Sequence, residues 1–151
     1  MTEYPSPVPF PSDDAESPGI YREIYGMPAF ARIPTLDLLE SARFWTDGLG
    51  FEELFMVPGV LVHLRRWAFQ DVLLAPGGTA GPSAIALSFA CVLSELRPAA
   101  ERCEALRPGS TNGPHERPWN STELEVTTPE GALVVLTAAR PFDPAQGMPA
   151  F

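Results

Sequence analysis

The residues able to do chemistry in this chain are few, and their spacing matches no common catalytic motif. Its two histidines, His63 and His115, lie far apart, and neither has an acidic residue beside it at metal-ligand spacing. The two cysteines, Cys91 and Cys103, match no zinc pattern and lack an activating neighbour. No glycine-rich phosphate loop or nucleophile elbow is present. The residues alone therefore assign no catalytic group and no metal ligand.

Aromatic residues in predicted connections are better candidates for contact with a ligand. Trp67 and Trp119 both fall between predicted strands, where a large ring is not needed for the core. Each ring can line a cleft, lie at a subunit contact or pack within the fold, and a flat ring holds a planar ligand by stacking. His63, in a predicted strand, is either a structural hydrogen-bonded residue or a functional one, and we keep it among the candidate contacts.

The charge of the chain indicates which partners it favours. The formal net charge is −9, and all ten basic residues are arginines. Such an acidic chain repels nucleic acid and anionic membrane surfaces and favours cationic small molecules or basic partners. The alternative is that the charge serves solubility alone.

The lack of a recognisable targeting signal and the use of cysteine predict a cytoplasmic protein. No apolar run approaches the roughly 20 residues of a membrane span. The chain lacks the basic start followed by an apolar core that would indicate secretion. We expect Cys91 and Cys103 to be buried free thiols in a reducing compartment, with a disulfide between them as the alternative.

The positioning elements are organised around one amphipathic helix, predicted over residues 37–51. Asp37 is its expected N-cap, and Glu40, three residues later, completes a capping-box pattern. An apolar stripe recurs at helical spacing, made by Leu38, Ala42, Trp45 and Leu49. Gly48 and Gly50 end the helix, because glycine adopts left-handed conformations at little steric cost.

Strands surround this helix, and the same order then repeats. Strands are predicted at residues 27–34, 52–57, 60–65 and 70–75, then at 83–92, 121–127 and 132–138. A second helix begins after Ser94 as cap, and residues 107–119 read as a loop with a short strand near His115. This doubling is an internal duplication. We divide the chain into a flexible acidic, proline-rich arm (1–26), a first module (27–76), a linker (77–82), a second module (83–139) and a flexible tail (140–151).

Two motifs within these elements carry a family resemblance. The stretch from Ile33-Pro34-Thr35 to Leu49-Gly50-Phe51, with Phe44-Trp45-Thr46-Asp47 inside it, resembles the bleomycin-binding resistance proteins of the vicinal oxygen chelate superfamily. Arg117-Pro118-Trp119, Glu123 and the turn at Thr128 to Gly131 are similar to a later signature of that family. Here Asn120 or Ser121 stands in place of the family's glycine, and Thr128 in place of its aspartate.

The resemblance implies a fold and an assembly. The fold is α+β, with two βαβββ modules whose mixed, curved sheets form a cleft. The assembly is a homodimer with two grooves built from both chains, and the N-terminal strand next to Pro34 is a candidate for exchange between subunits.

The resemblance also implies which residues lie in the site. Enzymes of this superfamily hold a divalent metal at positions that fall here near Phe30, Leu74, Leu87 and Val135, all apolar, so no metal or other cofactor is expected. Phe55 and Met56, beside Glu52 and Glu53, correspond to the drug groove, where Leu87 and Phe89 match tryptophans of the family. The full set of predicted ligand contacts is Phe30, Glu53, Phe55, Met56, His63, Trp67, Leu87, Phe89, Trp119 and Val135.

The sequence thus predicts a metal-free protein that binds and sequesters an aromatic or cationic antibiotic or natural product. Apolar side chains would exclude water from the ligand, while net negative charge attracts a cation. One alternative is a lyase, isomerase or dioxygenase of the same fold, either cofactor-free or with a metal bound by His63. Another is a regulatory protein that contacts a larger partner through its N-terminal arm.

Overall fold

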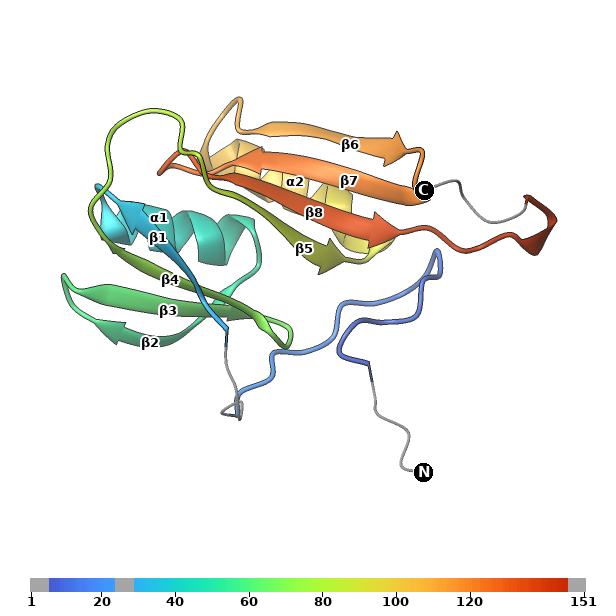
Figure 1. The fold of residues 1–151 in the computed structure, drawn as a ribbon, viewed down its shortest axis with the longest axis horizontal. Helices are drawn as coiled ribbons and strands as arrows, with labels where there is room; N and C mark the ends of the chain where they lie inside the picture. Colours follow the sequence, from blue (N-terminus) through green and yellow to red (C-terminus); the bar gives the residue numbers. More distant parts are fainter. Residues whose placement is uncertain (1–5, 24–28, 147–151) are drawn as a thin grey trace.

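The computed structural model describes residues 6–23 and 29–146, which contain two four-stranded sheets and two helical segments that cover them (Figure 1). The first module comprises β1 (Ala31–Thr35), α1 (Leu38–Arg43), η1 (Phe44–Gly48), β2 (Glu52–Val57), β3 (Leu61–Arg66) and β4 (Gln70–Pro76). The second comprises β5 (Ala86–Cys91), α2 (Leu93–Leu106), β6 (Thr111–Arg117), β7 (Ser121–Thr127) and β8 (Leu133–Ala139). A short 3-10 turn, η2 (Pro144–Gln146), follows.

Both sheets have the same topology. The strand order is β1-β4-β3-β2 in the first sheet, here named sheet A, and β5-β8-β7-β6 in the second, named sheet B. In each, the first strand of the module pairs in parallel with the last, and the other pairs are antiparallel. The predicted α+β fold of two βαβββ modules with mixed sheets is confirmed.

The central helix begins as predicted and ends in an unforeseen way. The side chain of Asp37 accepts a hydrogen bond from the amide of Glu40 at 2.9 Å, as an N-cap should. From Phe44 the helix widens into a π-helical turn, in which the amide of Leu49 donates to the carbonyl of Phe44. This turn packs on α2, and Gly48 lies so close to it that an added Cβ would come 3.1 Å from the Cys103 sulfur.

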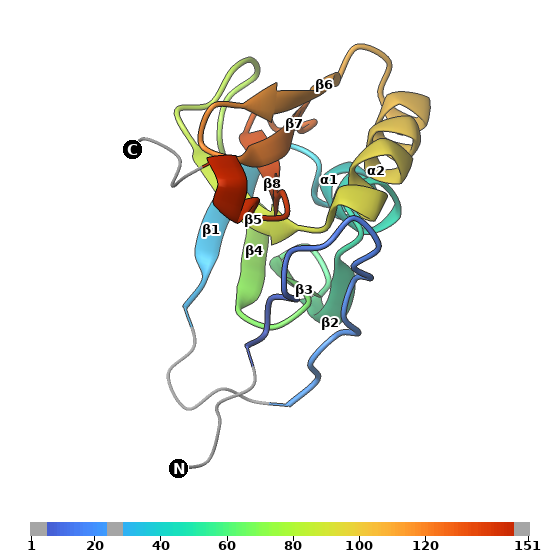
Figure 2. The same cartoon turned by 90° about the vertical axis from the view of Figure 1, so that its right-hand side faces the viewer.

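The two modules share one hydrophobic core, with α1 and α2 lying together on one side of the molecule (Figure 2). Its largest fully buried side chain is Trp45, which contacts Phe51 and Phe89 edge to face at ring distances of 5.0 and 6.3 Å. Phe89 comes from the second module, so this aromatic cluster joins the modules. Such pairs contribute about 0.5–1.5 kcal/mol each beyond the area they bury.

Two local predictions differ from the structure. Residues 107–119, expected as a loop with a short strand near His115, contain the seven-residue strand β6 (Thr111–Arg117) at the edge of sheet B. Ser94 does not cap α2; the N-cap is Val92, and the Ser94 hydroxyl donates instead to the carbonyl of Ala15 at 2.9 Å. Pro98 lies in the second turn of α2, and both Ser94 and Pro98 are exposed, so water can reach the carbonyl that proline leaves unbonded.

The described part of the N-terminal arm, residues 6–23, has no helix or strand but contacts the body. The amide of Tyr21 donates to the carbonyl of Trp67 at 3.0 Å, at the turn between β3 and β4. Before this point, the arm passes the end of sheet B where β5 meets α2 (Figures 1 and 2). The start of the predicted strand at 27–34 and the end of the predicted tail at 147–151 lie outside the described residues. In the described part of the chain, no helix has the length and apolarity to cross a membrane.

Candidate functional site

Each sheet has one face that packs on the helices and one open face. In sheet A the register places Leu73 opposite Arg32 on one side and His63 on the other, and His63 opposite Phe55. Cross-strand neighbours share a face, and the intervening residue Leu74 is buried against the helices. Arg32, Leu73, His63 and Phe55 therefore cross the open face of sheet A in one row.

A buried charged cluster lies beside this row. Asp71 Oδ2 lies 2.7 Å from His63 Nε2, and the guanidinium of Arg65 donates to both Asp71 carboxylate oxygens at 2.9–3.1 Å. Arg65 also donates to the carbonyls of Tyr21 and Glu23 in the arm. The side chains of Asp71 and Arg65 are almost fully buried, which makes these charge-assisted hydrogen bonds strong. This cluster orients the His63 ring and fastens the arm.

Two predicted contacts flank His63 on the open face. The ring of Phe30 meets His63 edge to face at 4.9 Å, and Phe55, opposite His63, is 57% exposed. Phe30, His63 and Phe55 therefore form an aromatic strip across sheet A. By contrast, Glu53 and Met56 pair with Leu64 and Val62, whose side chains face the helices, so these two predicted contacts point to the other side of the sheet. The carboxylate on the same face as Phe55 is Glu52, which is ion-paired with Arg22.

The open face of sheet B carries two carboxylates and an exposed tryptophan. Glu123 accepts hydrogen bonds from Trp119 Nε1 at 2.8 Å and from Arg117 Nε at 3.2 Å. Arg117 also donates to Glu125 at 2.9 Å, and the predicted contact Val135 lies beside Glu125 in the register. Because one guanidinium serves two carboxylates, this cluster keeps a negative charge, next to a Trp119 ring that is 51% exposed.

The other predicted contacts lie away from the open faces. Leu87 and Phe89 pair with Val134 and Leu136, which are buried, and both pack against the core. Trp67 is only 3% exposed, because it packs in the turn after β3, with the Arg66 guanidinium 4.3 Å from its ring centre. The structure thus brings together Phe30, His63 and Phe55 on sheet A and Trp119 and Val135 on sheet B, and it leaves Glu53, Met56, Trp67, Leu87 and Phe89 outside both groups.

The side chains present do not fit the metal centre of the superfamily. Of the positions assigned to it, Leu74 and Leu87 face the helices, and their neighbours on the open faces are Leu73 and Ser88. These, like Phe30 and Val135, supply no oxygen or nitrogen ligand of the kind a divalent metal prefers, apart from one serine hydroxyl. Among residues 6–23 and 29–146, no three His, Cys, Asp or Glu side chains lie close enough together to hold a metal ion.

Both cysteines are free and buried. Burial raises the pKa of the Cys103 thiol to about 12. Burial also raises the pKa of Cys91, although Arg66, whose Nη2 lies 3.3 Å from its sulfur, acts in the opposite direction. The same burial lowers the pKa of Arg66. Thiols held neutral in this way are poor nucleophiles.

Sequence reasoning missed the charged partners on both open faces. Asp71 and Arg65 lie opposite each other in the β3–β4 hairpin, a pairing that the short connection between two strands could have indicated. Glu123 and Glu125 alternate with Leu124 and Val126, the period-two pattern that places both carboxylates on the solvent side of a strand. This second signal was visible in the residues.

Comparisons with known proteins support the fold. No protein-family model matches the chain, and no curated protein sequence matches it. Among solved structures, a glyoxalase-related enzyme from Fulvimarina pelagi is 21% identical, with a TM-score of 0.61 over 76% of this chain and 88% of that one. A bleomycin resistance determinant encoded on the transposon Tn5 is 21% identical, with a TM-score of 0.57 over 76% and 99%. The fosfomycin resistance protein FosX from Mesorhizobium loti is 17% identical, with a TM-score of 0.59 over 78% and 94%.

These likenesses agree with the topology and confirm at the level of the fold the resemblance read from the motifs. The chain has the fold of the glyoxalase/bleomycin resistance/dioxygenase proteins, the vicinal oxygen chelate fold.

Proposed function

We propose that this protein binds and sequesters a small aromatic or cationic molecule, such as an antibiotic or natural product, without converting it. The observation that carries the proposal is the Trp119 ring, half exposed and held by Glu123 beside a second carboxylate, Glu125. A fixed ring offers a stacking surface whose orientation is set before the ligand arrives. The neighbouring carboxylates attract a positive group on the same ligand.

The charge of the whole chain supports the same ligand class. A net charge of −9 raises the local concentration of cations and speeds their association. Arg117 neutralises only one of the two glutamates, so the open face of sheet B retains negative charge at the point where Trp119 is exposed. A ligand with a flat ring and a cationic group would use both features.

We further propose that the ligand is enclosed by a homodimer. In one chain, the aromatic strip of sheet A and the carboxylates of sheet B lie on separate open faces, each solvent-exposed in part. A second copy that sets its sheet A opposite sheet B would form two equivalent grooves. Within the described residues, β1 is an edge strand that pairs with β4 alone, so exchange of this strand between subunits would preserve its hydrogen bonds. The molar mass measured by light scattering, with and without ligand, tests this assembly.

The function is tested by thermal-shift and calorimetric titration with bleomycin-type drugs, mitomycins and polycyclic aromatic antibiotics, with metal analysis of the same sample. A ligand that binds only the native state raises the melting temperature by mass action. Trp119→Ala should weaken a binding drug at least tenfold, the effect of about 1.4 kcal/mol. Trp119→Phe should retain much of the affinity, because a flat ring remains.

Leu39→Ala is the control, because Leu39 is an exposed apolar side chain on α1, a helix that packs on β3 and β4 of the other sheet. It should bind the drug as the natural chain does. Sequestration is wrong if no drug in the panel stabilises the protein, or if the drug is chemically altered on incubation.

A second candidate function, a cofactor-free enzyme of the same fold, is favoured by His63. Its Nε2 lies 2.7 Å from a buried carboxylate that Arg65 holds in place, an arrangement that orients an imidazole for proton transfer. Known structures with this fold include a lactoylglutathione lyase from Agrobacterium tumefaciens, so the fold accommodates both classes. Turnover of a tested compound that disappears in His63→Asn, while the melting temperature and drug binding persist, would establish this function.

A further inference from the structure

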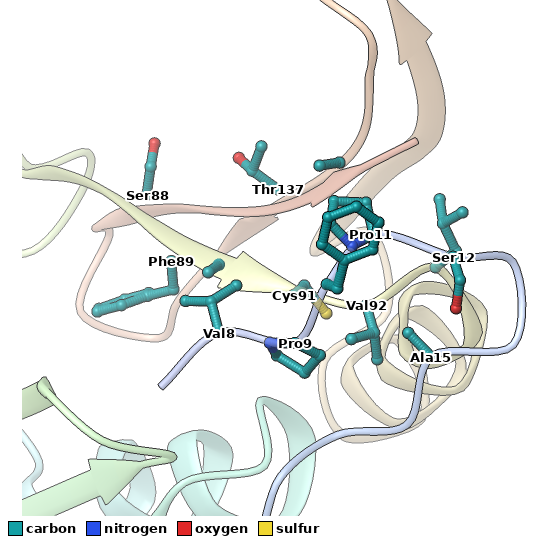
Figure 3. Close-up of a pocket in the computed structure, with 14 residues that line it drawn as sticks. Val8, Pro9, Pro11, Ser12, Ala15, Ser88, Phe89, Cys91, Val92 and Thr137 are labelled. Carbon is teal, nitrogen blue, oxygen red and sulfur yellow. The ribbon is translucent and has the colours of Figure 1, made fainter. Parts of the chain in front are cut away.

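A cavity of about 340 Å³ lies between the N-terminal arm and the end of sheet B. Figure 3 shows the arm passing β5, with Val8 and Pro9 near Phe89 and with Pro11 near Cys91. The walls come from the arm, from β5 with the start of α2, and from β8. The lining residues are Val8, Pro9, Phe10, Pro11, Ser12, Ala15, Ser88, Phe89, Ala90, Cys91, Val92, Leu93, Thr137 and Ala139.

The arm is anchored to the body by hydrogen bonds and an ion pair that follow its cavity-lining segment. On the C-terminal side, the carbonyl of Ala15 accepts a hydrogen bond from Ser94 at 2.9 Å. Further along, Tyr21 bonds to Trp67 and Arg65, and Arg22 pairs with Glu52. The segment from Val8 to Ala15 is thereby kept over β5 although it has no regular secondary structure.

The lining has an unusual composition for so acidic a protein. It contains no Asp, Glu, Arg, Lys or His, although the chain has a net charge of −9. Polar groups are few, chiefly the hydroxyls of Ser88 and Thr137, which lie on the open-face side of their strands, opposite to Phe89 (Figure 3). Small-molecule sites are typically apolar, with a few polar groups that set orientation, and span roughly 300–1,000 Å³.

We infer that this cavity is a binding site for a small, uncharged and mostly apolar molecule, with the arm as its outer wall. An uncharged ligand loses no ionic hydration on entry, whereas a charged one would find no counter-ion in the lining. A single polar end can bond to Ser88 or Thr137. Phe10 lines the cavity while 88% exposed, so a bound molecule also covers part of an aromatic ring that otherwise faces water.

This site differs from the proposed drug site in its place and its chemistry. The cavity lies along the free edge of β5, whereas Trp119 lies in the turn between β6 and β7, at the opposite edge of sheet B. The two adjoin at β8, where the lining residue Thr137 pairs with Glu123 of β7. The lining of the cavity is uncharged, whereas the drug site is acidic.

The test is a fluorescence titration of the full chain with N-phenyl-1-naphthylamine, an uncharged dye that brightens in apolar surroundings. We expect saturable binding of one dye per chain. Ala139→Trp should fill the cavity and weaken binding at least tenfold. Ala86→Trp is the matched control, because Ala86 is an exposed strand alanine of the same sheet that does not line the cavity, and it should bind as the natural chain does.

The role of the arm is tested by Val8→Asp with Phe10→Asp, two exposed positions whose change places charge in the apolar wall without disturbing the core. This variant should also lose at least tenfold in affinity. Bound dye should slow the alkylation of Cys91 by N-ethylmaleimide but not that of Cys103, which does not line the cavity.

Three results would overturn the inference: no saturable binding, unchanged binding by Ala139→Trp, or unchanged binding by the arm variant. Loss of dye binding in Trp119→Ala would also overturn it, because the dye would then occupy the acidic open face. Failure of every antibiotic to bind, with dye binding intact, would refute the proposed function alone.

Discussion

Glu130→Ala should destabilise the protein by cutting the polar link between the two modules. Glu130 lies in the turn between β7 and β8, and its carboxylate accepts hydrogen bonds from Trp45 Nε1 at 2.6 Å and from Ser41 Oγ at 2.9 Å. Ser41 in turn lies 2.7 Å from Thr35 Oγ1. The late turn motif of the second module thus anchors the central helix of the first.

The magnitude follows from which donor is left without a partner. Trp45 is fully buried, and an unsatisfied buried donor costs about 1–3 kcal/mol. Ser41 can donate to Thr35 instead, so its loss adds little. Glu130 also lines a polar cavity of about 510 Å³, through which water can approach the vacated site. We therefore expect about 1–2 kcal/mol for Glu130→Ala. Glu130→Gln should cost less, because its amide oxygen still accepts from Trp45 and its amide nitrogen can donate to Ser41.

The assay is urea unfolding of the natural chain, Glu130→Ala, Trp45→Phe and the double variant. Trp45→Phe removes the donor, so in that background Glu130→Ala should be nearly neutral, and the cycle should give a coupling energy of about 1–2 kcal/mol. A coupling energy near zero would show that the Trp45–Glu130 bond contributes nothing net, and the reasoning would then fail.

Three further predictions concern packing, pH and the arm. Gly48→Ala should lower the free energy of unfolding by about 1 kcal/mol, because its Cβ would come 3.1 Å from the Cys103 sulfur and this crowding exceeds the gain from alanine in a helix. Adding Cys103→Ala to this variant should relieve the crowding and restore stability. An unchanged urea midpoint in Gly48→Ala would refute the contact. Burial raises the pKa of Cys103 from 9.0 to about 12, so this thiol ionises in the unfolded chain at a lower pH than in the folded one. Its contribution to the free energy of unfolding should therefore be constant below pH 9 and fall by up to about 1.4 kcal/mol per pH unit above it. Urea unfolding measured from pH 7 to 10.5 should show a shallower fall in Cys103→Ala. Ser94→Ala removes the bond to Ala15 and should speed limited proteolysis within residues 6–23, whereas an unchanged cleavage rate would mean that this bond does not hold the arm.

The fold was readable from the sequence because local signals and the internal repeat agree. Asp37 and the apolar stripe behind it define one helix, and the element order then occurs twice. Only a short strand near His115 was predicted where β6 spans seven residues, because β6 contains Gly113 and Pro114, which normally interrupt strands. As an edge strand paired only with β7, β6 tolerates an irregular register at these residues. The π-helical turn at Phe44–Gly48 was missed because it depends on how Gly48 fits against α2, a contact between modules.

The candidate site was only partly readable, because periodicity did not fix which residues face the open side. β5 has apolar residues on both faces, with Ala86 and Ala90 on one and Leu87 and Phe89 on the other, so its phase could not be read from hydrophobicity. Glu53 lies off the predicted face for a different reason. The register of β2 shifts between Glu53 and Phe55, which a simple alternation does not anticipate. Met56 directly follows Phe55, so alternation itself places these two side chains on opposite faces.

The two modules share a topology, but the charges on their open faces are arranged for different tasks. On sheet A, Arg65 is bonded to Asp71 and to carbonyls of the arm, so its charge is balanced and buried, and the exposed surface is formed by Phe55, Phe30 and Arg32. On sheet B, Arg117 is divided between Glu123 and Glu125 near the surface, so negative charge remains accessible. In the proposed homodimer each groove receives one face of each kind. A ligand that fits it is therefore expected to offer an aromatic side to sheet A and a ring with a cationic group to sheet B.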